Sequence, residues 1–381
     1  MVVDFDDGSS AGYLDLWLAD HDPAAIHPTS MQRQRYAMDE KDINSAHIRE
    51  AKLENDGRTV RVTWKSGHAS KFDAPYLSSN RYGDDEDSSL SASSGSASRH
   101  VLSTEAPKLQ KSWDGDSLRN RLVRIENAAK DDDACKQAAL SALLKHGVVI
   151  LEGIPPNIDA TEHVARSWFG GVRETVYGTM WDTSPKEESD VNDTAFTKEA
   201  IKQHTDCTYY ADTPGLQIFH CSEQDVSPGC GYTLIADGLK IAEALHQRFP
   251  EAFDFFSTTP LRFRCLDEGA HLSALRTIID IDAAGRMKQF AYNPYDLAPL
   301  TYLSDGDLEA FYRHHAALSS LTTSREFTFS IRLLPGEMMV VNNHRVLHGR
   351  TAFKGSRNML GCYVGFDEWH SSARCAGVLQ E

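Results

Sequence analysis

The chain of 381 residues carries a net charge of −16 and has 41% hydrophobic and 25% charged residues, which is ordinary for a folded globular protein. These values exclude a disordered chain, a collagen and a coiled-coil rod, and the acidic balance excludes nucleic-acid binding through a broad basic face. No window of 18 apolar residues occurs, so we expect no transmembrane helix. The acidic net charge is expected to repel the chain from anionic membrane surfaces.

Residues 1–80 are predicted to form a small β-rich domain. The strand-like runs Ile48–Leu53 and Thr59–Trp64 flank a turn that contains Asp56-Gly57, and Asp-Gly is a strong hairpin signal. Ala69–Phe72 is a candidate third strand. A sheet of three short strands needs something to pack on.

Residues 81–105 are predicted to be a flexible linker, because they are rich in Ser and Asp and contain too little apolar surface to order themselves. Residues 106–381 are predicted to form one larger domain. Its helical stretches are Ala134–His146 with the candidate C-cap Gly147, Asp159–Trp168 with Asp159 as candidate N-cap, Gly238–Phe249 and Asp305–Leu321.

The strands of this larger domain are short and numerous. The strand-like runs are Val148–Leu151, Gly215–Cys221, Tyr232–Ala236, Leu261–Cys265, Thr277–Ile281, Phe327–Leu334 and Met338–Asn342. The last two are expected to pair as a hairpin across Pro335-Gly336-Glu337. Regular alternation of strands and helices is absent, so we predict a mainly β fold, a sandwich or double-sheet barrel with helical cover.

The segment Gln203-His204-Thr205-Asp206 is a candidate metal site. In an extended strand, residues i and i+2 share a face, so His204 and Asp206 can present an imidazole and a carboxylate together. His344 and His348, far downstream, are both candidates for a third ligand. Two histidines and one carboxylate form the facial triad of non-haem Fe(II) oxygenases. The chain holds 16 histidines, so a surface polar pair explains the bare motif as well.

Arg357 follows His348 by nine residues and precedes the apolar pair Met359-Leu360. A guanidinium on a strand can hold a carboxylate through two hydrogen bonds, as the far end of 2-oxoglutarate requires. Thr233 can donate its hydroxyl to the same carboxylate. The alternative for Arg357 is a surface ion pair.

Tyr177 and Trp181 stand four residues apart and share one face if that segment is helical. Two interpretations stay open at this point. The rings are either part of an ordinary core, or a wall that holds a quaternary ammonium by cation–π attraction.

The seven cysteines are odd in number and include no Cys-x-x-Cys pair. This pattern indicates reduced thiols rather than a disulfide framework. The N-terminus lacks the basic and apolar regions of a signal peptide, and we therefore predict a cytoplasmic location.

Several stretches resemble the trimethyllysine dioxygenases, which are related to the γ-butyrobetaine dioxygenases within the taurine-dioxygenase-like group. The stretches that carry the resemblance are Arg173–Gly178, Asp193–Lys198, His204–Tyr210, Gly215–Cys221, Arg345–Arg350 and Gly361–Tyr363. The resemblance covers nearly the whole chain, is strong between residues 170 and 370, and is thin before residue 100.

The resemblance implies a double-stranded β-helix, or jelly roll, that binds Fe(II), 2-oxoglutarate and O₂. Carried over position by position, it makes His204, Asp206 and His348 the metal ligands, in place of His344. It makes Arg357 the clamp for 2-oxoglutarate. Ascorbate is expected to support activity, and relatives of this kind are often homodimers.

The resemblance also implies a substrate site for an amino acid. The positions that match an aromatic cage for a trimethylammonium group are Tyr177, Trp181, Phe196 and Tyr363. Asp193 matches a carboxylate that can pair with the substrate's α-ammonium group. The implied reaction is hydroxylation of Nε-trimethyllysine at Cβ, as in carnitine synthesis.

Departures from the family pattern keep other functions open. The Cys-rich segment of the N-terminal domain is missing, so we expect no structural zinc. Phe196 stands where Tyr is common, Asn293-Pro294 stands where Asn-Asn is frequent, and His344 replaces a Trp. The alternative is an oxygenase of secondary metabolism that hydroxylates, desaturates or cyclises another free amino acid or amine, for example to an aziridine. A silent scaffold and a zinc hydrolase are weaker alternatives.

Overall fold

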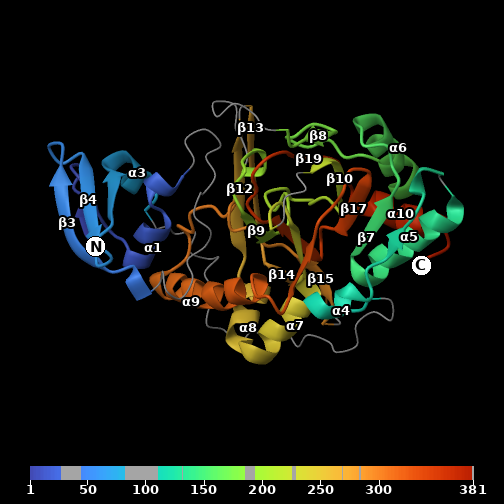
Figure 1. Ribbon diagram of the computed structural model, residues 1–381. Helices are drawn as coiled ribbons and strands as arrows, with labels where there is room; N and C mark the ends of the chain where they lie inside the picture. Colours follow the sequence, from blue (N-terminus) through green and yellow to red (C-terminus); the bar gives the residue numbers. More distant parts are fainter. Residues whose placement is uncertain are drawn as a thin grey trace.

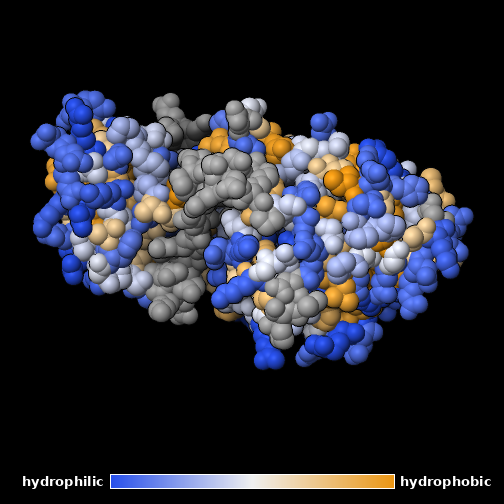
Figure 2. Space-filling model, turned by 45° about the horizontal axis from the view of Figure 1, so that its top comes forward, coloured by the Kyte–Doolittle hydropathy of each residue, from blue (hydrophilic) through white to orange (hydrophobic). Residues whose placement is uncertain are grey.

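The computed structural model describes residues 1–26, 44–81, 110–130, 132–184, 194–224, 229–267, 269–282 and 285–379. The predicted linker at 81–105 therefore lies almost entirely outside the described residues. Among the described residues, no helix has the length and apolar character needed to cross a membrane. Hydrophilic side chains cover most of both ends of the molecule in Figure 2, in keeping with the charged composition.

Two β-sheets lie face to face at the centre of the molecule (Figure 1). The six-stranded sheet has the order β6 (Arg124–Ile125), β7 (Val148–Glu152), β17 (Glu337–Asn342), β10 (Leu216–Gln224), β19 (Arg357–Val364) and β8 (Trp181–Asp182). The four-stranded sheet has the order β16 (Thr328–Ile331), β11 (Thr233–Asp237), β18 (Val346–Arg350) and β9 (Ile201–His204). Inward residues of both sheets, such as Ile150, Ile235 and Met339, form one apolar cluster between them. The jelly-roll prediction is confirmed.

Helices cover both outer faces of this double sheet. The helices on the six-stranded sheet are α5 (Asp133–His146), α6 (Ile158–Phe169) and α10 (Phe366–Cys375), and those on the four-stranded side are α7 (Gly238–Arg248), α8 (Pro250–Thr258) and α9 (Asp305–Thr322). Gly147 ends α5 in the left-handed conformation with φ 75°, as predicted. The predicted N-cap of α6 is wrong, because the Asn157 side chain, not that of Asp159, accepts a hydrogen bond from the Ala160 amide.

The predicted hairpin between the last two strand-like runs is also wrong. β16 pairs with β11 in the four-stranded sheet, whereas β17 lies between β7 and β10 in the six-stranded sheet. The turn at Pro335-Gly336-Glu337 thus carries the chain from one sheet to the other. Five of the six residues of β17 are buried, which suits a central strand covered on both faces and not half of an exposed hairpin.

The N-terminal sheet contains the three predicted strands, β3 (Ile48–Glu54), β4 (Thr59–Trp64) and β5 (Ala69–Asp73), in that order. Helix α1 (Asp15–Asp20) packs against α9 of the larger domain. Trp17 and Leu18 belong to the same apolar cluster as Phe311, and the Tyr312 hydroxyl donates to the Asp20 carboxylate at 3.0 Å. The N-terminal sheet and the part of the chain that contains the double sheet therefore share one core.

Smaller elements complete the described chain. They are β1 (Val2–Asp4) paired with β2 (Ser10–Gly12), β12 (Leu261–Asp267) with β13 (Ala270–Arg276), β14 (Ile279–Ile281) with β15 (Met287–Phe290), and the helices α3 (Ala74–Ser79) and α4 (Gly115–Arg119). The hairpin of β12 and β13 stands up beside β9 in Figure 1.

Candidate metal and substrate site

Neighbouring strands of the four-stranded sheet bring the predicted metal ligands together. His204 ends β9, and His348 lies directly opposite it on β18. Asp206 follows β9 by two residues. The ligand atoms of these three side chains all lie within 4.8 Å of one another, which makes them a group that can hold a metal ion.

Both histidines direct Nε2 toward the same carboxylate oxygen. The distance from Asp206 Oδ1 is 3.0 Å to His204 Nε2 and 3.5 Å to His348 Nε2. The other ring nitrogen of His204 lies 2.8 Å from the Lys202 carbonyl oxygen, which holds the proton on Nδ1 and leaves Nε2 free to ligate. Burial lowers the pKa of His348 and favours its neutral, ligating form.

The second oxygen of Asp206 has partners of its own. Oδ2 accepts hydrogen bonds from the Gln217 side-chain amide and from the Tyr363 hydroxyl, the latter at 2.7 Å. Burial alone would raise the pKa of Asp206, but the charge interactions and hydrogen bonds with His348 and His204 hold it well below its usual value. The carboxylate is therefore charged and offers one oxygen, so each of the three residues provides one donor. This donor set fits a divalent iron with open positions.

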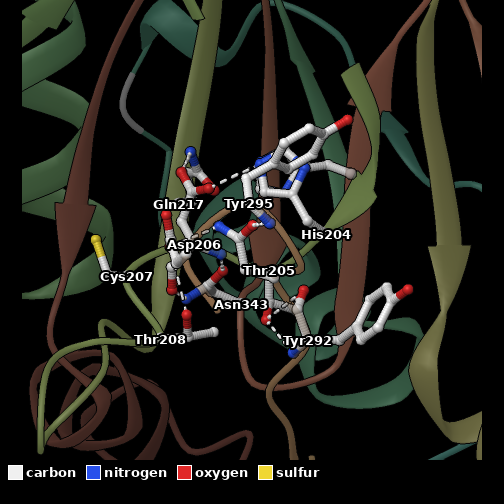
Figure 3. A network of polar contacts seen from close by, with 12 residues as sticks. His204, Thr205, Asp206, Cys207, Thr208, Gln217, Tyr292, Tyr295 and Asn343 are labelled. Carbon is white, nitrogen blue, oxygen red and sulfur yellow. Dashed lines mark hydrogen bonds and ion pairs between the residues drawn. The ribbon is translucent and has the colours of Figure 1, made fainter. Parts of the chain in front are cut away.

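Asn343 holds the backbone of Asp206 in place. Its Oδ1 accepts from the Asp206 amide at 2.8 Å, and its Nδ2 donates to the carbonyls of Asp206 and Pro214 at 3.0 and 3.1 Å. Figure 3 shows Asp206 between Gln217 and Asn343. Directly after Asp206, Cys207 adopts a left-handed conformation with φ 60°, so the chain turns sharply at the site.

The two downstream histidines occupy different positions. The His344 ring lies at hydrogen-bond distance from Thr213, 2.9 Å from its hydroxyl, and stacks on Phe366. It does not line the cavity at the metal site, whereas His348 does.

Arg357 is buried next to Thr233. The Arg357 side chain is 6% exposed, and its Nη2 donates to the Thr233 hydroxyl at 3.2 Å. Its Nε has no hydrogen-bond partner, and no carboxylate of the described residues forms an ion pair with it. Burial lowers the pKa of Arg357 to about 10, so the guanidinium stays charged at neutral pH. A buried cation with spare donors is a site for an anionic ligand such as a carboxylate.

One cavity of about 110 Å³ contains the metal triad, Arg357 and the predicted aromatic residues. Its aromatic wall includes Tyr177, Trp181 and Tyr363, with ring centroids 6.2 Å apart for Trp181 and Tyr363 and 6.4 Å for Tyr177 and Tyr363. Phe196 lines the same cavity. Asp193 lies outside the described residues.

The helical spacing considered for Tyr177 and Trp181 is wrong. Tyr177 lies in a turn closed by backbone hydrogen bonds between Thr175 and Gly178, and Trp181 lies on β8. Trp181 pairs with Gly361 of β19, and this pairing carries its ring over the cavity.

The family model for "Taurine catabolism dioxygenase TauD, TfdA family" matches residues 115–363, which is more than half of the chain. The chain belongs to this family. It is a dioxygenase, and the His–Asp–His group and the buried Arg357 fit the iron and 2-oxoglutarate of such enzymes.

Curated relatives match along nearly the whole chain. The mitochondrial trimethyllysine dioxygenase of Rattus norvegicus is 28% identical, with 95% of this chain and 82% of the relative covered. The γ-butyrobetaine dioxygenase of Pseudomonas sp. (strain AK-1) is also 28% identical, with coverage of 96% and 91%. A solved taurine dioxygenase structure from Burkholderia xenovorans is 18% identical, covers 62% of this chain and 85% of that chain, and has a TM-score of 0.46. The cytoplasmic location and the homodimer stay predictions.

The TauD/TfdA-family dioxygenase needs a glycine at position 361, because the Trp181 ring packs directly against this position. A Cβ atom at Gly361 would collide with the Ile218 carbonyl oxygen and with the Trp181 ring. We expect Gly361→Ala to lower the free energy of unfolding by about 1–3 kcal/mol and to weaken substrate binding by displacing Trp181. Thermal unfolding and substrate titration measure both effects. Gly12→Ala is the control, because its Cβ would meet nothing within 4 Å; equal stability of the two variants would contradict the prediction.

Sequence reasoning missed several residues of this dioxygenase's cavity. Gln217, Asn343, Tyr209, Tyr295 and Asp296 were not assigned roles, although all but Asn343 line the cavity. A signal was present in the strand period, since residues i and i+2 share a face. Gln217 and Phe219 alternate on β10, as Arg357, Met359 and Tyr363 do on β19, and all five face the cavity.

Proposed function

We propose that this dioxygenase hydroxylates Nε-trimethyllysine at Cβ, with Fe(II) held by His204, Asp206 and His348 and 2-oxoglutarate held by Arg357. The observation that carries the proposal is that one cavity combines the triad, a buried unpaired guanidinium and a wall of aromatic rings. Iron and 2-oxoglutarate, when bound, use O₂ to supply the oxidant that removes a hydrogen atom from carbon, with succinate and CO₂ as by-products.

The protein's own residues prepare this chemistry by holding the reactants in place. Arg357 and Thr233 would hold the far carboxylate of 2-oxoglutarate. Asp206 would hold the metal through one oxygen, because the other accepts hydrogen bonds from Gln217 and Tyr363. The substrate is positioned by the cavity walls, so the carbon nearest the metal is the one that reacts.

The aromatic wall supports a trimethylated substrate. Trimethyllysine and γ-butyrobetaine, which appear in the names of the rat and Pseudomonas relatives, both carry a trimethylammonium group. Such a cation has no N–H to donate, so ring faces hold it by cation–π attraction where ordinary hydrogen-bond acceptors cannot. Tyr177, Trp181 and Tyr363 provide neighbouring rings of this kind.

The second candidate substrate is another free amino acid or amine. The observation that favours it is that Phe196, which stands where Tyr is common, lines the cavity. A phenyl ring at this position keeps the aromatic face and loses a hydroxyl, which changes the groups that the cavity accepts and, with them, the carbon that is oxidised.

Succinate formation distinguishes these candidates. The assay supplies Fe(II), ascorbate and 2-oxoglutarate and compares trimethyllysine with lysine and with a panel of free amino acids. The proposal predicts a trimethyllysine-dependent signal and a product heavier by one oxygen atom in mass spectrometry. A signal with another amino acid only, above all with a product lighter by two hydrogen atoms, would replace the proposal by the second candidate.

Trp181→Ala is expected to weaken binding of trimethyllysine about 30-fold, because a desolvated cation–π contact contributes about 2 kcal/mol. Lysine is the matched control, since its ammonium can be solvated or hydrogen-bonded without the ring. Binding is measured by calorimetric titration of the metal-loaded protein. An equal loss of affinity for trimethyllysine and for lysine would contradict the proposed aromatic cage.

A further inference from the structure

We propose that Tyr363 couples substrate binding to metal binding. Its ring is part of the substrate wall, and its hydroxyl donates to the carboxylate that holds the metal. This inference rests on the proposed function for two assignments: that Asp206 is a ligand and that the aromatic cavity receives the substrate. From the sequence, Tyr363 was predicted only as a residue of the aromatic cage.

The hydroxyl group of Tyr363 has well-defined polar neighbours. The hydroxyl donates to Asp206 Oδ2 at 2.7 Å, and the Gln217 Nε2 that donates to the same oxygen lies 3.5 Å from the Tyr363 hydroxyl. Asp206 Oδ1 is the oxygen that faces both histidines. Tyr363 therefore acts on the ligand from the side opposite the metal, where hydrogen bonds orient the carboxylate and tune its donor strength.

The ring side of Tyr363 is equally constrained. Tyr363 lies opposite Gln217 in the pairing of β10 with β19, and its carbonyl accepts from the Arg173 amide at 2.7 Å. The side chain is 3% exposed and contacts the rings of Tyr177 and Trp181. The ring cannot shift toward a ligand without moving the hydroxyl that holds Asp206.

A cation seated against this ring changes the hydrogen bond at its edge. It withdraws electron density from the phenol and makes the hydroxyl a stronger donor to Asp206. The stronger hydrogen bond fixes the carboxylate with Oδ1 toward the two histidines, and this fixed orientation tightens metal binding. Because coupling between two binding sites is reciprocal, the metal must strengthen substrate binding by the same factor.

The test is a calorimetric titration of Fe(II) into the apo protein under anaerobic conditions, with and without trimethyllysine. For the wild type we expect trimethyllysine to tighten Fe(II) binding about fivefold or more. For Tyr363→Phe, which keeps the ring, we expect Fe(II) binding about 10-fold weaker than in the wild type. In this variant, the factor by which trimethyllysine tightens Fe(II) binding should fall to nearly one. A purely structural role of Tyr363 would not produce this effect.

Tyr177→Phe is the matched control. It removes a hydroxyl from the same wall, but that hydroxyl accepts from Tyr209 at 3.3 Å and does not touch Asp206. Its Fe(II) affinity should equal that of the wild type. Wild-type affinity and undiminished coupling in Tyr363→Phe would overturn the inference.

Failure of the proposed function would give different results from failure of the coupling between substrate and metal. If Asp206→Ala bound Fe(II) as tightly as the wild type, the ligand assignment itself would be wrong. If another amino acid drove succinate formation, that compound would replace trimethyllysine in the titration, and loss of coupling in Tyr363→Phe would still be required.

Discussion

Replacement of Asp206 by Ala is expected to stop succinate formation, with a loss of at least about three orders of magnitude. The metal contributes several kcal/mol to the barrier it lowers, and each 1.36 kcal/mol is about a factor of ten in rate. Asp206 is the residue whose Oδ1 faces both histidines, so its removal leaves two neutral donors and no charge to oppose the cation. Fe(II) titration and succinate production check the two parts of this expectation.

The two downstream histidines provide a matched pair of controls. His348→Ala should resemble Asp206→Ala, because His348 lies opposite His204 at the triad. His344→Gln should keep Fe(II) binding, because the His344 ring lies at Thr213 and outside the cavity. Loss of Fe(II) binding in His344→Gln, with an intact fold by circular dichroism, would contradict the ligand assignment.

Arg357→Met is expected to raise the KM for 2-oxoglutarate by about 30-fold or more. Truncation of one partner in a buried, hydrogen-bonded charge pair costs about 2–5 kcal/mol, much of it from the carboxylate that is left without a partner. Fe(II) affinity should be unchanged, because Arg357 does not contact any of the three ligands. Steady-state assays at varied 2-oxoglutarate, with Fe(II) titration alongside, separate the two properties.

Thr233→Val is the control variant with a smaller expected effect on 2-oxoglutarate binding. A neutral hydrogen bond contributes about 0.5–1.5 kcal/mol, so the KM for 2-oxoglutarate should rise by less than about 10-fold. An unchanged KM in Arg357→Met would mean that the cosubstrate is bound elsewhere in the cavity.

Local signals in the sequence predicted local structure well. Gly147 and the apolar run after it were sufficient to place the end of α5 and the strand β7, because capping and burial depend on neighbours in the chain. The partner of β17 was missed, because nothing in the strand itself says which sheet it joins. Its neighbours, β7 and β10, come from more than a hundred residues away.

The candidate site shows the same difference between local signals, which are visible in the sequence, and long-range contacts, which are not. His204 and Asp206 were visible as a strand motif, and the resemblance chose His348 over His344 where spacing alone did not. Asn343 had no visible role, because its amide acts on a backbone 137 residues away. The bond from Tyr363 to Asp206 was hidden for the same reason, since it exists only when the two sheets face each other.

The contact between α1 and α9 affects how the protein must be made. Tyr312 and Asp20 are separated by 292 residues, so the first helix leaves the ribosome long before the helix that covers it. At about 5–20 residues per second, the delay is roughly 15–60 s. During that time Trp17 and Leu18 have no α9 to pack against, so we expect the nascent chain to expose these two apolar side chains until the second half of their core is made.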